Sequence, residues 1–515
     1  YHAAMQNKGS PTVILAKTVK GYGLGEAGEG MNTAHNTKKL GVEHRLALRD
    51  RFDLPLSDQQ VKDLEYLTLK KGSAEQQYLH AQRESLGGYF PTRSSDCELL
   101  TVPDLAAFQS LLDGSGDREL STSMAFSRIL SVLLKDKQLK QRIVPIMVDE
   151  SRTFGLEGLF RQIGIFSANG QAYTPEDKEQ LMYYREDEKG QLLQQGLSEA
   201  GGIASWTAVA TSYSTTKVPM IPFYVYYSMF GFQRIGDFVW AAADAQARGF
   251  IIGGTAGRTT LAGEGLQHQD GHNLLMFSMV PNCVSYDPCF GYEMAIIIQD
   301  GLRRMYQEQE NVFYYITAMN ENYAQPAMPK GIEKDVLKGL YALHKPKKKD
   351  ALSVQLIGGG TILREVIAAQ TILQDEYGVS ASVWSATSFN ELRRDAESVA
   401  RYNRLHPKAK PKVSHVRRCF DDVDTPIIAA TDYMKLYAEQ VRQDIQAPYY
   451  VLGTDGFGRS DTRAALREFF EVDANMIAYT ALKALFDQGK IEQDVLLQAQ
   501  KTLNIDTRRA APDQS

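Results

Sequence analysis

The chain lacks the long apolar runs and the strong positive charge that mark membrane and nucleic-acid-binding proteins. Its longest apolar stretches, such as Ala295–Ile298, are far shorter than the roughly 20 residues that a membrane-spanning helix needs. Its 57 lysine and arginine residues are outnumbered by 62 acidic residues, which gives a net charge of -5. Nucleic-acid-binding chains usually have a basic excess. We therefore expect neither a membrane nor a nucleic acid as a partner.

Cysteine is scarce, and no secretion signal is recognisable. The chain has four cysteines, none of them in a CxxC pair: Cys97, Cys283, Cys289 and Cys419. So few cysteines cannot form a disulfide scaffold and fit a reducing compartment, so we expect a cytoplasmic location. The chain begins without the charged and apolar segments of a signal peptide. We interpret this start as a cut inside a longer protein, because residues 12–17 already have the pattern of a strand from the middle of a sheet.

What the chain does have is an alternation of apolar strands and helices. Its 515 residues suggest two to four domains. Helical stretches at 233–247 and 293–308 separate short apolar runs that are typical of buried strands. These predicted strands are 143–148, 220–227, 250–253, 283–286 and 312–316. The alternation indicates an α/β fold with doubly wound, mainly parallel sheets covered on both faces.

A second block of alternation follows a break in the pattern. The run Lys345–Asp350 is polar, contains proline and is the best candidate linker. Beyond it we expect a strand at 353–357 and a helix at 362–377, and then a strand at 449–452 and a helix near 476–489. By contrast, the region before the first block is charged and helical in pattern, as in a connecting arm.

A glycine-rich stretch near the start matches a nucleotide-binding pattern only in part. Gly23-Leu-Gly-Glu-Ala-Gly28 fits GxGxxG and follows a predicted strand. A dinucleotide site also needs those glycines to open a helix with an apolar face, whose N-terminus holds the pyrophosphate. The residues from Glu29 to His35 do not have that pattern. We interpret the stretch as a mobile active-site loop.

Two other short motifs have plain explanations. Ser214-Thr-Thr-Lys217 matches the SxxK of serine acylases, but no SDN or KTG motif accompanies it, so we expect a polar turn. Gly358-Gly-Gly-Thr361 could hold an anion at a helix N-terminus, or it could form a tight turn with Thr361 as the N-cap. The sequence leaves both alternatives open.

Three histidines lie in polar, glycine-flanked stretches: His35, His268 and His272. The last two are four residues apart, but without a helix or an HExxH motif they make only a weak zinc signal. Histidine titrates near neutral pH and loops often carry function. Proton transfer is therefore the better interpretation, with an ordinary surface loop as the alternative.

Three acidic positions point to a ligand site. Asp149 and Glu150 directly follow the predicted strand at 143–148, and the carboxyl ends of strands are where open α/β sheets place ligand sites. Glu199 lies in the small-residue segment Gly196–Gly202, where a carboxylate can be buried against a ligand. A glutamate on the surface of a helix is the alternative.

Five longer stretches together resemble the homodimeric pyruvate dehydrogenase component of bacteria, a member of the transketolase superfamily. They are Ala16–Gly23 (AKTVKGYG), Asp149–Gly164 (DESRTFGLEGLFRQIG), Tyr226–Gly236 (YYSMFGFQRIG), Glu264–His272 (EGLQHQDGH) and Gly453–Asp461 (GTDGFGRSD). The likeness runs from about residue 10 to near the C-terminus, and stretches of this length are specific.

The resemblance implies a chain of three α/β domains and active sites at the interface of a homodimer. Residues 1–42 would end the diphosphate-binding domain and include its mobile loop. Residues 43–98 would form a connecting helical arm, 99–344 the pyrimidine-binding domain, and 350–515 a transketolase C-terminal-like domain.

The resemblance also implies an activity, with thiamine diphosphate and Mg²⁺ as cofactors. The activity is oxidative decarboxylation of pyruvate and acetylation of the lipoyl domain of dihydrolipoyl acetyltransferase. Glu199 matches the glutamate that hydrogen-bonds the pyrimidine nitrogen N1′. Leu197 matches the apolar residue under the thiazolium, and Phe230 matches the ring against the pyrimidine. The other positions that match active-site residues of the family are Lys20, Asp149, Glu150, Tyr227 and His268, with His35 in the loop tied to lipoyl acetylation.

One departure from the family pattern concerns the metal. The family's diphosphate motif, Gly-Asp-Gly followed downstream by Asn, would lie N-terminal to Tyr1. Thr454-Asp455-Gly456 resembles it only superficially, because the next asparagine, Asn475, is too close. We therefore expect no Mg²⁺ ligand within this segment. Two alternatives remain: another thiamine enzyme, such as transketolase or the 2-oxoglutarate dehydrogenase component, or an inactive dimerisation fragment.

Overall fold

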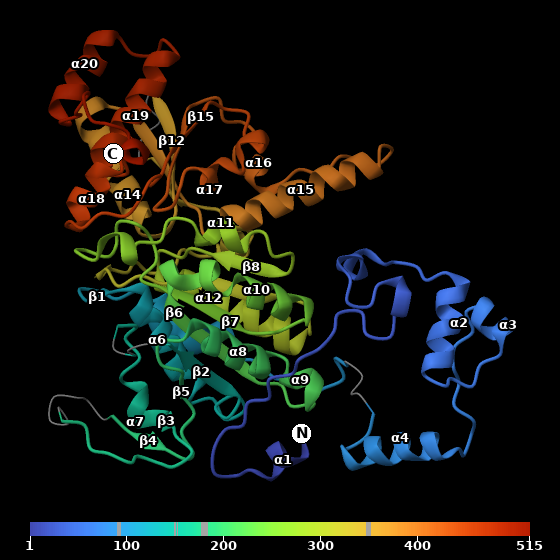
Figure 1. Ribbon diagram of the computed structural model, residues 1–515. Helices are drawn as coiled ribbons and strands as arrows, with labels where there is room; N and C mark the ends of the chain where they lie inside the picture. The colour runs from blue at the N-terminus through green and yellow to red at the C-terminus, as the bar shows by residue number, and fades with distance from the viewer. Residues whose placement is uncertain (90–93, 149–150, 152, 177–183, 347–351) are drawn as a thin grey trace. The chain divides into compact units, whose positions relative to one another are not determined.

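The computed structural model of the protein describes residues 1–89, 94–148, 151, 153–176, 184–346 and 352–515 (Figure 1). The chain divides into two compact units, Tyr1–Thr92 and Arg93–Ser515. Among the described residues, no helix is both long enough and apolar enough to span a membrane.

The first unit is helical where it has regular structure. Its longer helices are α2 (Val42–Arg51), α3 (Asp58–Lys62) and α4 (Ala74–Ser85), as the charged helical pattern predicts. The other elements are α1 (His2–Gln6) and the 3-10 turns η1 (Gly25–Ala27) and η2 (Asn32–Asn36). The predicted strand at 12–17 is wrong, since these residues form no strand. A strand needs a neighbour for its backbone hydrogen bonds, and the described part of this unit contains no strand to pair with.

A six-stranded parallel sheet forms the first half of the second unit. Its order is β5-β2-β6-β7-β9-β8. The strands are β2 (Ile143–Met147), β5 (Leu193–Gln194), β6 (Ile221–Tyr227), β7 (Phe250–Gly254), β8 (Cys283–Tyr286) and β9 (Phe313–Thr317). The predicted strands are thereby confirmed, and β5 is an addition to them. The sequence pattern did not indicate β5 because it is only two residues long.

Helices cover both faces of this sheet. Gly202 of α8 (Glu199–Ala210) lies so close to the ring of Tyr224 that a Cβ atom there would come within 2.5 Å of it. On α6 (Thr122–Leu133), Phe126 packs on Phe223 with ring centroids 5.8 Å apart. Phe223 and Tyr224 are neighbours in β6, so their side chains point to opposite faces. Helix α10 (Gly231–Asp244) packs beside α8, and α12 (Gly291–Leu302) packs beside α6.

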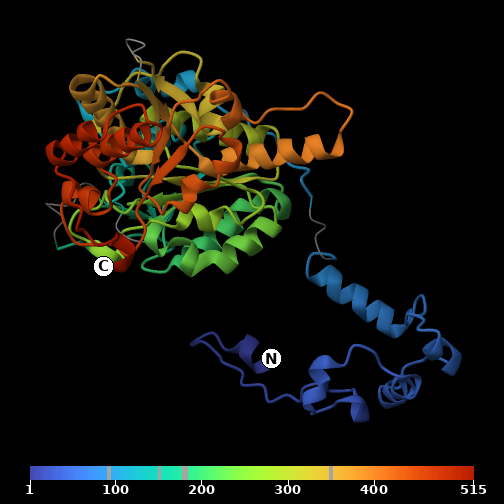
Figure 2. The same ribbon diagram turned by 90° about the horizontal axis from the view of Figure 1, so that it is seen from above.

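The second half of the unit contains a five-stranded mixed sheet of order β11-β13-β12-β14-β15. The strands are β11 (Tyr341–His344), β12 (Ser353–Gly358), β13 (Ser380–Ser385), β14 (Ile427–Ala430) and β15 (Tyr449–Leu452). Only β11 is antiparallel to its neighbour. The two helices α14 (Leu363–Tyr377) and α19 (Ala474–Asp487) pack against each other, and α15 (Phe389–Leu405) extends away from the sheet (Figures 1 and 2).

The second block of alternation is confirmed at both of its predicted strands and both of its predicted helices. The predicted linker is only partly visible, because residues 347–350 lie outside the described residues. The antiparallel edge strand β11 was not expected. It lies directly before this linker, in a stretch too short for its pattern to be distinguished from a loop.

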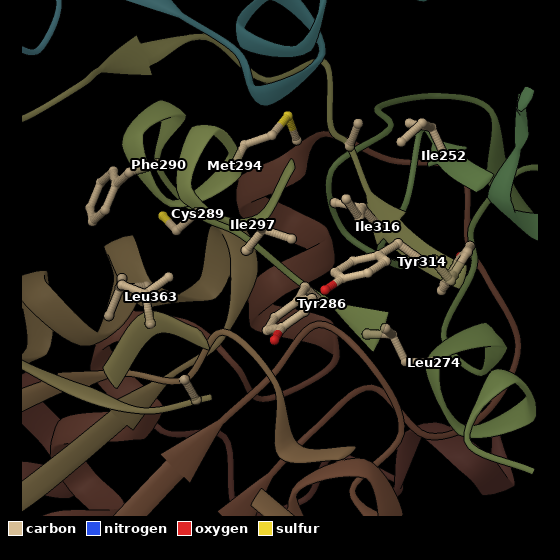
Figure 3. Packing of buried hydrophobic residues seen from close by; sticks show 14 of the residues in the cluster. Ile252, Leu274, Tyr286, Cys289, Phe290, Met294, Ile297, Tyr314, Ile316 and Leu363 are labelled. Carbon is tan, nitrogen blue, oxygen red and sulfur yellow. The ribbon is translucent and has the colours of Figure 1, made fainter. Parts of the chain in front are cut away.

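One hydrophobic core joins the two halves of the second unit. Figure 3 shows Tyr286 of β8 and Tyr314 of β9 beside Ile297 of α12, with Leu363 of α14 in the same cluster. All four side chains are fully buried or nearly so. Because apolar contacts continue from one sheet to the other, the two sheets pack together as one unit.

Candidate active site

The candidate site lies where β6 and β7 end. Strand β6 ends at Tyr227 and continues through the turn Ser228–Phe230 into α10. Strand β7 ends at Gly254 and continues into the segment Thr255–His272, which contains His268. Since β6 and β7 are parallel neighbours, both segments leave the same edge of the sheet.

Three rings meet at this edge. The ring of His268 lies 5.4 Å from that of Tyr227 and 5.4 Å from that of Phe230, measured between centroids. Tyr227 and Phe230 themselves are 5.8 Å apart in an edge-on arrangement. On its other side Tyr227 packs on Phe154, and its hydroxyl lies 3.4 Å from Thr153 Oγ1. The imidazole of His268 is thus held in a fixed aromatic wall, with 19% of its side chain exposed.

Glu199 is placed beside this wall by the start of helix α8. It is the first residue of the helix, and its neighbour Ser198 is the N-cap, accepting a hydrogen bond from Gly201 N at 3.1 Å. The hydroxyl of Tyr224 donates to the backbone oxygen of Glu199 at 3.1 Å. The carboxylate is only 15% exposed. It is therefore not the surface glutamate that the sequence left as the alternative.

Arg234 connects Glu199 with Phe230. Its Nη1 donates to Glu199 Oε1 at 2.8 Å, and its guanidinium carbon lies 4.1 Å from the centre of the Phe230 ring. Glu199 Oε2 forms no hydrogen bond in the part of the chain that the structure describes. Sequence reasoning missed Arg234, although its position four residues after Phe230 at the start of a helix was an available signal.

One ring nitrogen of His268 is buried against an acidic neighbour. Its Nδ1 lies 3.0 Å from Glu264 Oε2, which is close enough for an ion pair when the ring is protonated. The two groups are not aligned for a hydrogen bond, and Nδ1 has no hydrogen-bond partner among the described residues. Because Nδ1 is also buried from solvent, the imidazole can meet a ligand only through its partly exposed edge, and its other nitrogen, Nε2, has no hydrogen bond among the described residues.

The end of the His268 segment is fixed by a buried carboxylate. Asp270 accepts hydrogen bonds from His272 N at 2.9 Å and Asn273 N at 3.1 Å, and also from the hydroxyl of Ser228. Ser228 in turn bonds the hydroxyl of Tyr315 at 2.8 Å. His272 Nδ1 lies 3.7 Å from Asp270 Oδ1. Within the described ranges, no group of three or more His, Cys, Asp or Glu side chains converges in a way that could hold a metal ion.

Two buried carboxyl groups lie behind the site, between the two sheets. Asp287 follows β8 and accepts from Thr317 Oγ1 at 2.6 Å, while Asp432 follows β14 and accepts from Thr259 N at 3.1 Å. Burial raises the pKa of each carboxyl group to about 7, and the charge of Asp432 adds to the effect on Asp287. Asp432 thus holds the start of the His268 segment with a group that titrates near neutral pH.

Lys20 and His35 lie together in the first unit. Lys20 Nζ is 3.3 Å from His35 Nδ1, and both side chains are exposed. Nearby, Glu29 occupies the glycine-rich stretch: its carboxylate accepts from Gly23 N and Gly25 N, each at 3.1 Å, and pairs with Arg51. The amides of the GxGxxG pattern therefore bind the chain's own carboxylate, which agrees with the rejection of a dinucleotide site.

Of the three remaining predicted site residues, the structure describes only Leu197. Leu197 follows Gly196 just before helix α8, and 83% of its surface is exposed. So large an exposed apolar side chain beside Glu199 is what a ligand-contacting residue would present. Asp149 and Glu150 lie outside the described residues, directly after Val148.

The remaining short motifs are structural. The predicted polar turn is only partly right, because Ser214 lies in the one-turn helix α9 (Ser212–Thr215); its Oγ accepts from Ser94 N at 3.2 Å, and Lys217 pairs with Asp96 at 3.5 Å. The predicted N-cap role of Thr361 is wrong, because its hydroxyl is buried against Met319 and helix α14 begins after Ile362. The neighbouring Gly360 lies against the carboxylate of Asp287, which leaves no room for an anion.

Two family models match the second unit. Residues 100–326 match the pyruvate dehydrogenase E1 component middle domain. Residues 339–473 match the transketolase-like TK C-terminal domain. The first match contains Glu199, Tyr227, Phe230 and His268, and the second contains Asp432 and Arg459.

Bacterial relatives match almost the entire chain. A Pseudomonas aeruginosa protein named pyruvate dehydrogenase E1 component is 56% identical over 513 residues, covering 99% of this chain and 58% of that protein. An Escherichia coli protein of the same name is 54% identical over 515 residues, covering 99% of this chain and 58% of that protein. The chain thus spans less than two thirds of the length of these relatives.

Solved structures that resemble this one are transketolases. The transketolase from Leishmania mexicana superposes with a TM-score of 0.62 at 16% identity, covering 94% of this chain and 64% of that one. The transketolase from Campylobacter jejuni gives a TM-score of 0.60 at 18% identity, covering 94% and 65%. At such low identity the likeness concerns the fold, and it agrees with the predicted α/β fold.

Proposed function

This chain belongs to the pyruvate dehydrogenase E1 component family, and from this premise we propose that the full-length protein catalyses the thiamine-diphosphate-dependent oxidative decarboxylation of pyruvate. The two-carbon unit passes to the lipoyl group of a dihydrolipoyl acetyltransferase. The observation that carries the proposal is the 56% and 54% identity over 99% of the chain to proteins of that name. The cluster of Glu199, Phe230 and His268 supports it.

The side chains of this cluster fit the proposed cofactor. Glu199 is mostly buried and has one oxygen, Oε2, without a hydrogen bond among the described residues, so it can bind the pyrimidine nitrogen N1′. Phe230 offers a ring for the pyrimidine and Leu197 an exposed apolar surface for the thiazolium. Lys20 is the further residue we assign to cofactor binding. Bound thiamine diphosphate supplies a carbon nucleophile for the ketone of a 2-oxo acid and accepts the electrons released as CO2 leaves.

The groups near His268 serve the substrate in this proposal. Through Nε2, His268 can donate a proton to the oxygen of pyruvate's ketone as charge builds up there, or take it back. Tyr227 packs on the imidazole from one side and brings its own hydroxyl to the site. We also assign active-site roles to Asp149 and Glu150, on the basis of the sequence alone.

The second half of the reaction needs a proton at a different place. The lipoyl disulfide is reduced as the two-carbon unit is oxidised to a thioester, so one sulfur receives the acetyl group and the other a proton. We assign that proton transfer to His35, whose exposed ring lies beside Lys20. We further propose that the full-length protein is a cytoplasmic homodimer that uses Mg²⁺, with no metal ligand from this chain.

A test with competing substrates separates this function from its rivals. Full-length enzyme is given pyruvate or 2-oxoglutarate labelled at C1, with an artificial electron acceptor, and the released CO2 is counted. We expect release from pyruvate at least about tenfold faster. A preference for 2-oxoglutarate, or ketol transfer between sugar phosphates without CO2 release, would replace this proposal by another thiamine enzyme. No activity with any of these substrates would leave an inactive dimerisation protein.

A matched pair of variants ties the activity to the site. Glu199→Gln should slow CO2 release by roughly 10²–10⁴-fold, the usual contribution of acid–base assistance. Glu333→Gln is the control, because Glu333 is likewise the first residue of a helix and partly buried. If both variants released CO2 at the normal rate, the site would have to be sought elsewhere.

A further inference from the structure

Gln269, the residue after His268, connects the two halves of the second unit. Its side-chain carbonyl oxygen accepts from Arg459 N at 2.8 Å, and its side-chain nitrogen donates to Leu261 O at 3.0 Å. Only 1% of Gln269 is exposed. Its side chain points into the protein, whereas the ring of the preceding His268 packs on Tyr227 and Phe230 in the candidate site.

The segment with His268 has other hydrogen bonds to the C-terminal half of the chain. Gly263 N donates to Asp461 O at 3.0 Å, and Met434 N donates to Gly271 O at 2.9 Å. At the start of the segment, Arg463 Nε donates to Thr260 O at 2.5 Å. Backbone groups before and after His268 are thus bound by one domain, while the His268 side chain packs on rings of the other.

Glycines allow the two backbones to approach. A Cβ atom added to Gly458 would lie 2.8 Å from Gln269 Oε1 and 3.0 Å from Leu266 Cα. The second of these is a backbone atom, which cannot rotate away. On the opposite side, a Cβ atom on Gly265 would collide with the hydroxyl of Ser460. The stretches EGLQHQDGH and GTDGFGRSD therefore lie directly against each other.

From these contacts we propose that Gln269 is a positioning residue for His268, and that the C-terminal domain uses it to fix the imidazole in the site. The role of His268 itself rests on the proposed function. Gln269 can serve in this way because an amide is donor and acceptor at once. One side chain therefore ties Leu261, before His268, to Arg459 in the other domain. Without it, the segment keeps its neighbouring contacts, but the ring nitrogen can move by about 1 Å, which is enough to slow proton transfer.

A double-mutant cycle tests the proposal in the full-length enzyme. Gln269→Ala should lower kcat/KM for pyruvate about tenfold when His268 is present. In a His268→Ala background the same change should lower it by less than about twofold, because the group to be positioned is gone. Equal losses in both backgrounds would overturn the proposal. Gln269→Asn, which is too short to span both partners, is the second variant should Gln269→Ala fail to fold.

Gln325 provides a matched control. It is also buried, at 5% exposure, and it also accepts from one backbone nitrogen, Gly291 N at 2.9 Å, and donates to one backbone oxygen, Leu120 O. Gln325→Ala should cost similar stability, yet its effect on kcat/KM should be the same with and without His268. A cycle with Gln325→Ala as non-additive as that with Gln269→Ala would show that general loosening is responsible.

A measurement that needs no catalytic activity tests the positioning role of Gln269 independently of the proposed function. Diethyl pyrocarbonate modifies accessible imidazoles, and mass spectrometry of cofactor-free protein gives its rate at His268 alone. Gln269→Ala and Gly458→Ala should each raise that rate several-fold, and Gln325→Ala should not. An unchanged rate at His268 in both variants would refute the positioning role. If wild-type enzyme failed to act on pyruvate while the modification rates changed as expected, the proposed function would be wrong and the contact between the domains would stand.

Discussion

The segments around His35 and His268 are similar in composition and different in structure. Both are rich in glycine, both are polar, and each contains one histidine to which we assign a proton transfer. The segment with His35 forms short 3-10 turns whose residues are mostly exposed, and its glycine amides bind Glu29 of the same segment. The segment with His268 is buried at both of its ends, Thr255–Thr260 and Gln269–Gly271, and is bonded to residues far away in the chain, although most residues of 261–267 are exposed.

The difference teaches that a glycine-rich loop is mobile or fixed according to what it packs against. Glycine removes side-chain contacts, so a loop with solvent on most sides has little to hold it. The same absence of side chains lets two backbones come close, as Gly458 and Gln269 do. We therefore expect the His268 segment to be rigid and the His35 segment to move, which would suit the proposed transfer from His35 to a lipoyl domain.

Among the differences between these two segments, the largest expected effect is on the separate reactions that the two histidines assist. In full-length enzyme, His268→Ala should lower decarboxylation measured with an artificial electron acceptor by about 100-fold, within the range for proton-transfer groups. His35→Ala should leave that rate within about twofold and instead lower acetylation of a lipoyl domain by a similar factor. Equal losses in both assays for either variant would contradict the assignment.

A smaller effect should appear in amide hydrogen exchange of the wild-type protein. Peptides that cover residues 258–272 should exchange at least about tenfold more slowly than peptides that cover 21–37, since roughly 1.4 kcal/mol of extra opening free energy gives that factor. The measurement uses mass spectrometry at several times after dilution into deuterated water. Equal protection of the two segments would contradict the expected difference in rigidity between them.

The smallest effect is on how stability depends on pH. Its sign differs between Asp432, which binds the start of the His268 segment, and Glu29, which lies in the His35 segment. Burial raises the pKa of Asp432 to about 7 from about 3.9 in an unfolded chain. The folded state therefore keeps a proton that the unfolded state loses, and this group's contribution to stability falls as pH rises from about 4 to about 7. Asp432→Asn should remove that decline, so its melting temperature should improve relative to wild type between pH 5 and 7.

Glu29 should behave in the opposite way. The hydrogen bond from Arg51 lowers the pKa of its carboxyl group, so its contribution is present above the unfolded pKa of about 4.3 and is lost as pH falls below that. Glu29→Gln should therefore differ from wild type near neutral pH and converge with it below about pH 4. The effect should be small, because the pair is exposed. Parallel pH profiles for the two variants would contradict the assigned carboxylates.

Much of the sheet architecture could be predicted from sequence, and the failures have a common cause. Strands such as Ile143–Met147 are buried on both faces, so their apolar runs are visible without knowledge of neighbours. Residues 12–17 have a similar pattern, but a local pattern does not reveal whether a partner strand exists. For the same reason the reversed direction of β11 could not be anticipated.

Single residues of the site could be predicted from the sequence, but the contacts between them could not. Glu199 and His268 stand out because a carboxylate and an imidazole sit among small residues. Arg234 was missed because its partner Glu199 is 35 positions away and only folding brings them together. Gln269 was missed because a glutamine in a polar loop has nothing unusual about it until its bond to Arg459 is seen.

The central claim is that Glu199 activates thiamine diphosphate, and one measurement tests it directly. In full-length enzyme with bound cofactor, exchange of the hydrogen at thiazolium C2 for deuterium is followed by quenching and NMR. Glu199→Gln keeps the size of the side chain but loses the acidic proton, so exchange should slow by roughly 10²–10⁴-fold while folding and dimerisation persist. Exchange at the wild-type rate in Glu199→Gln would show that another carboxylate, Asp149 or Glu150, performs this step.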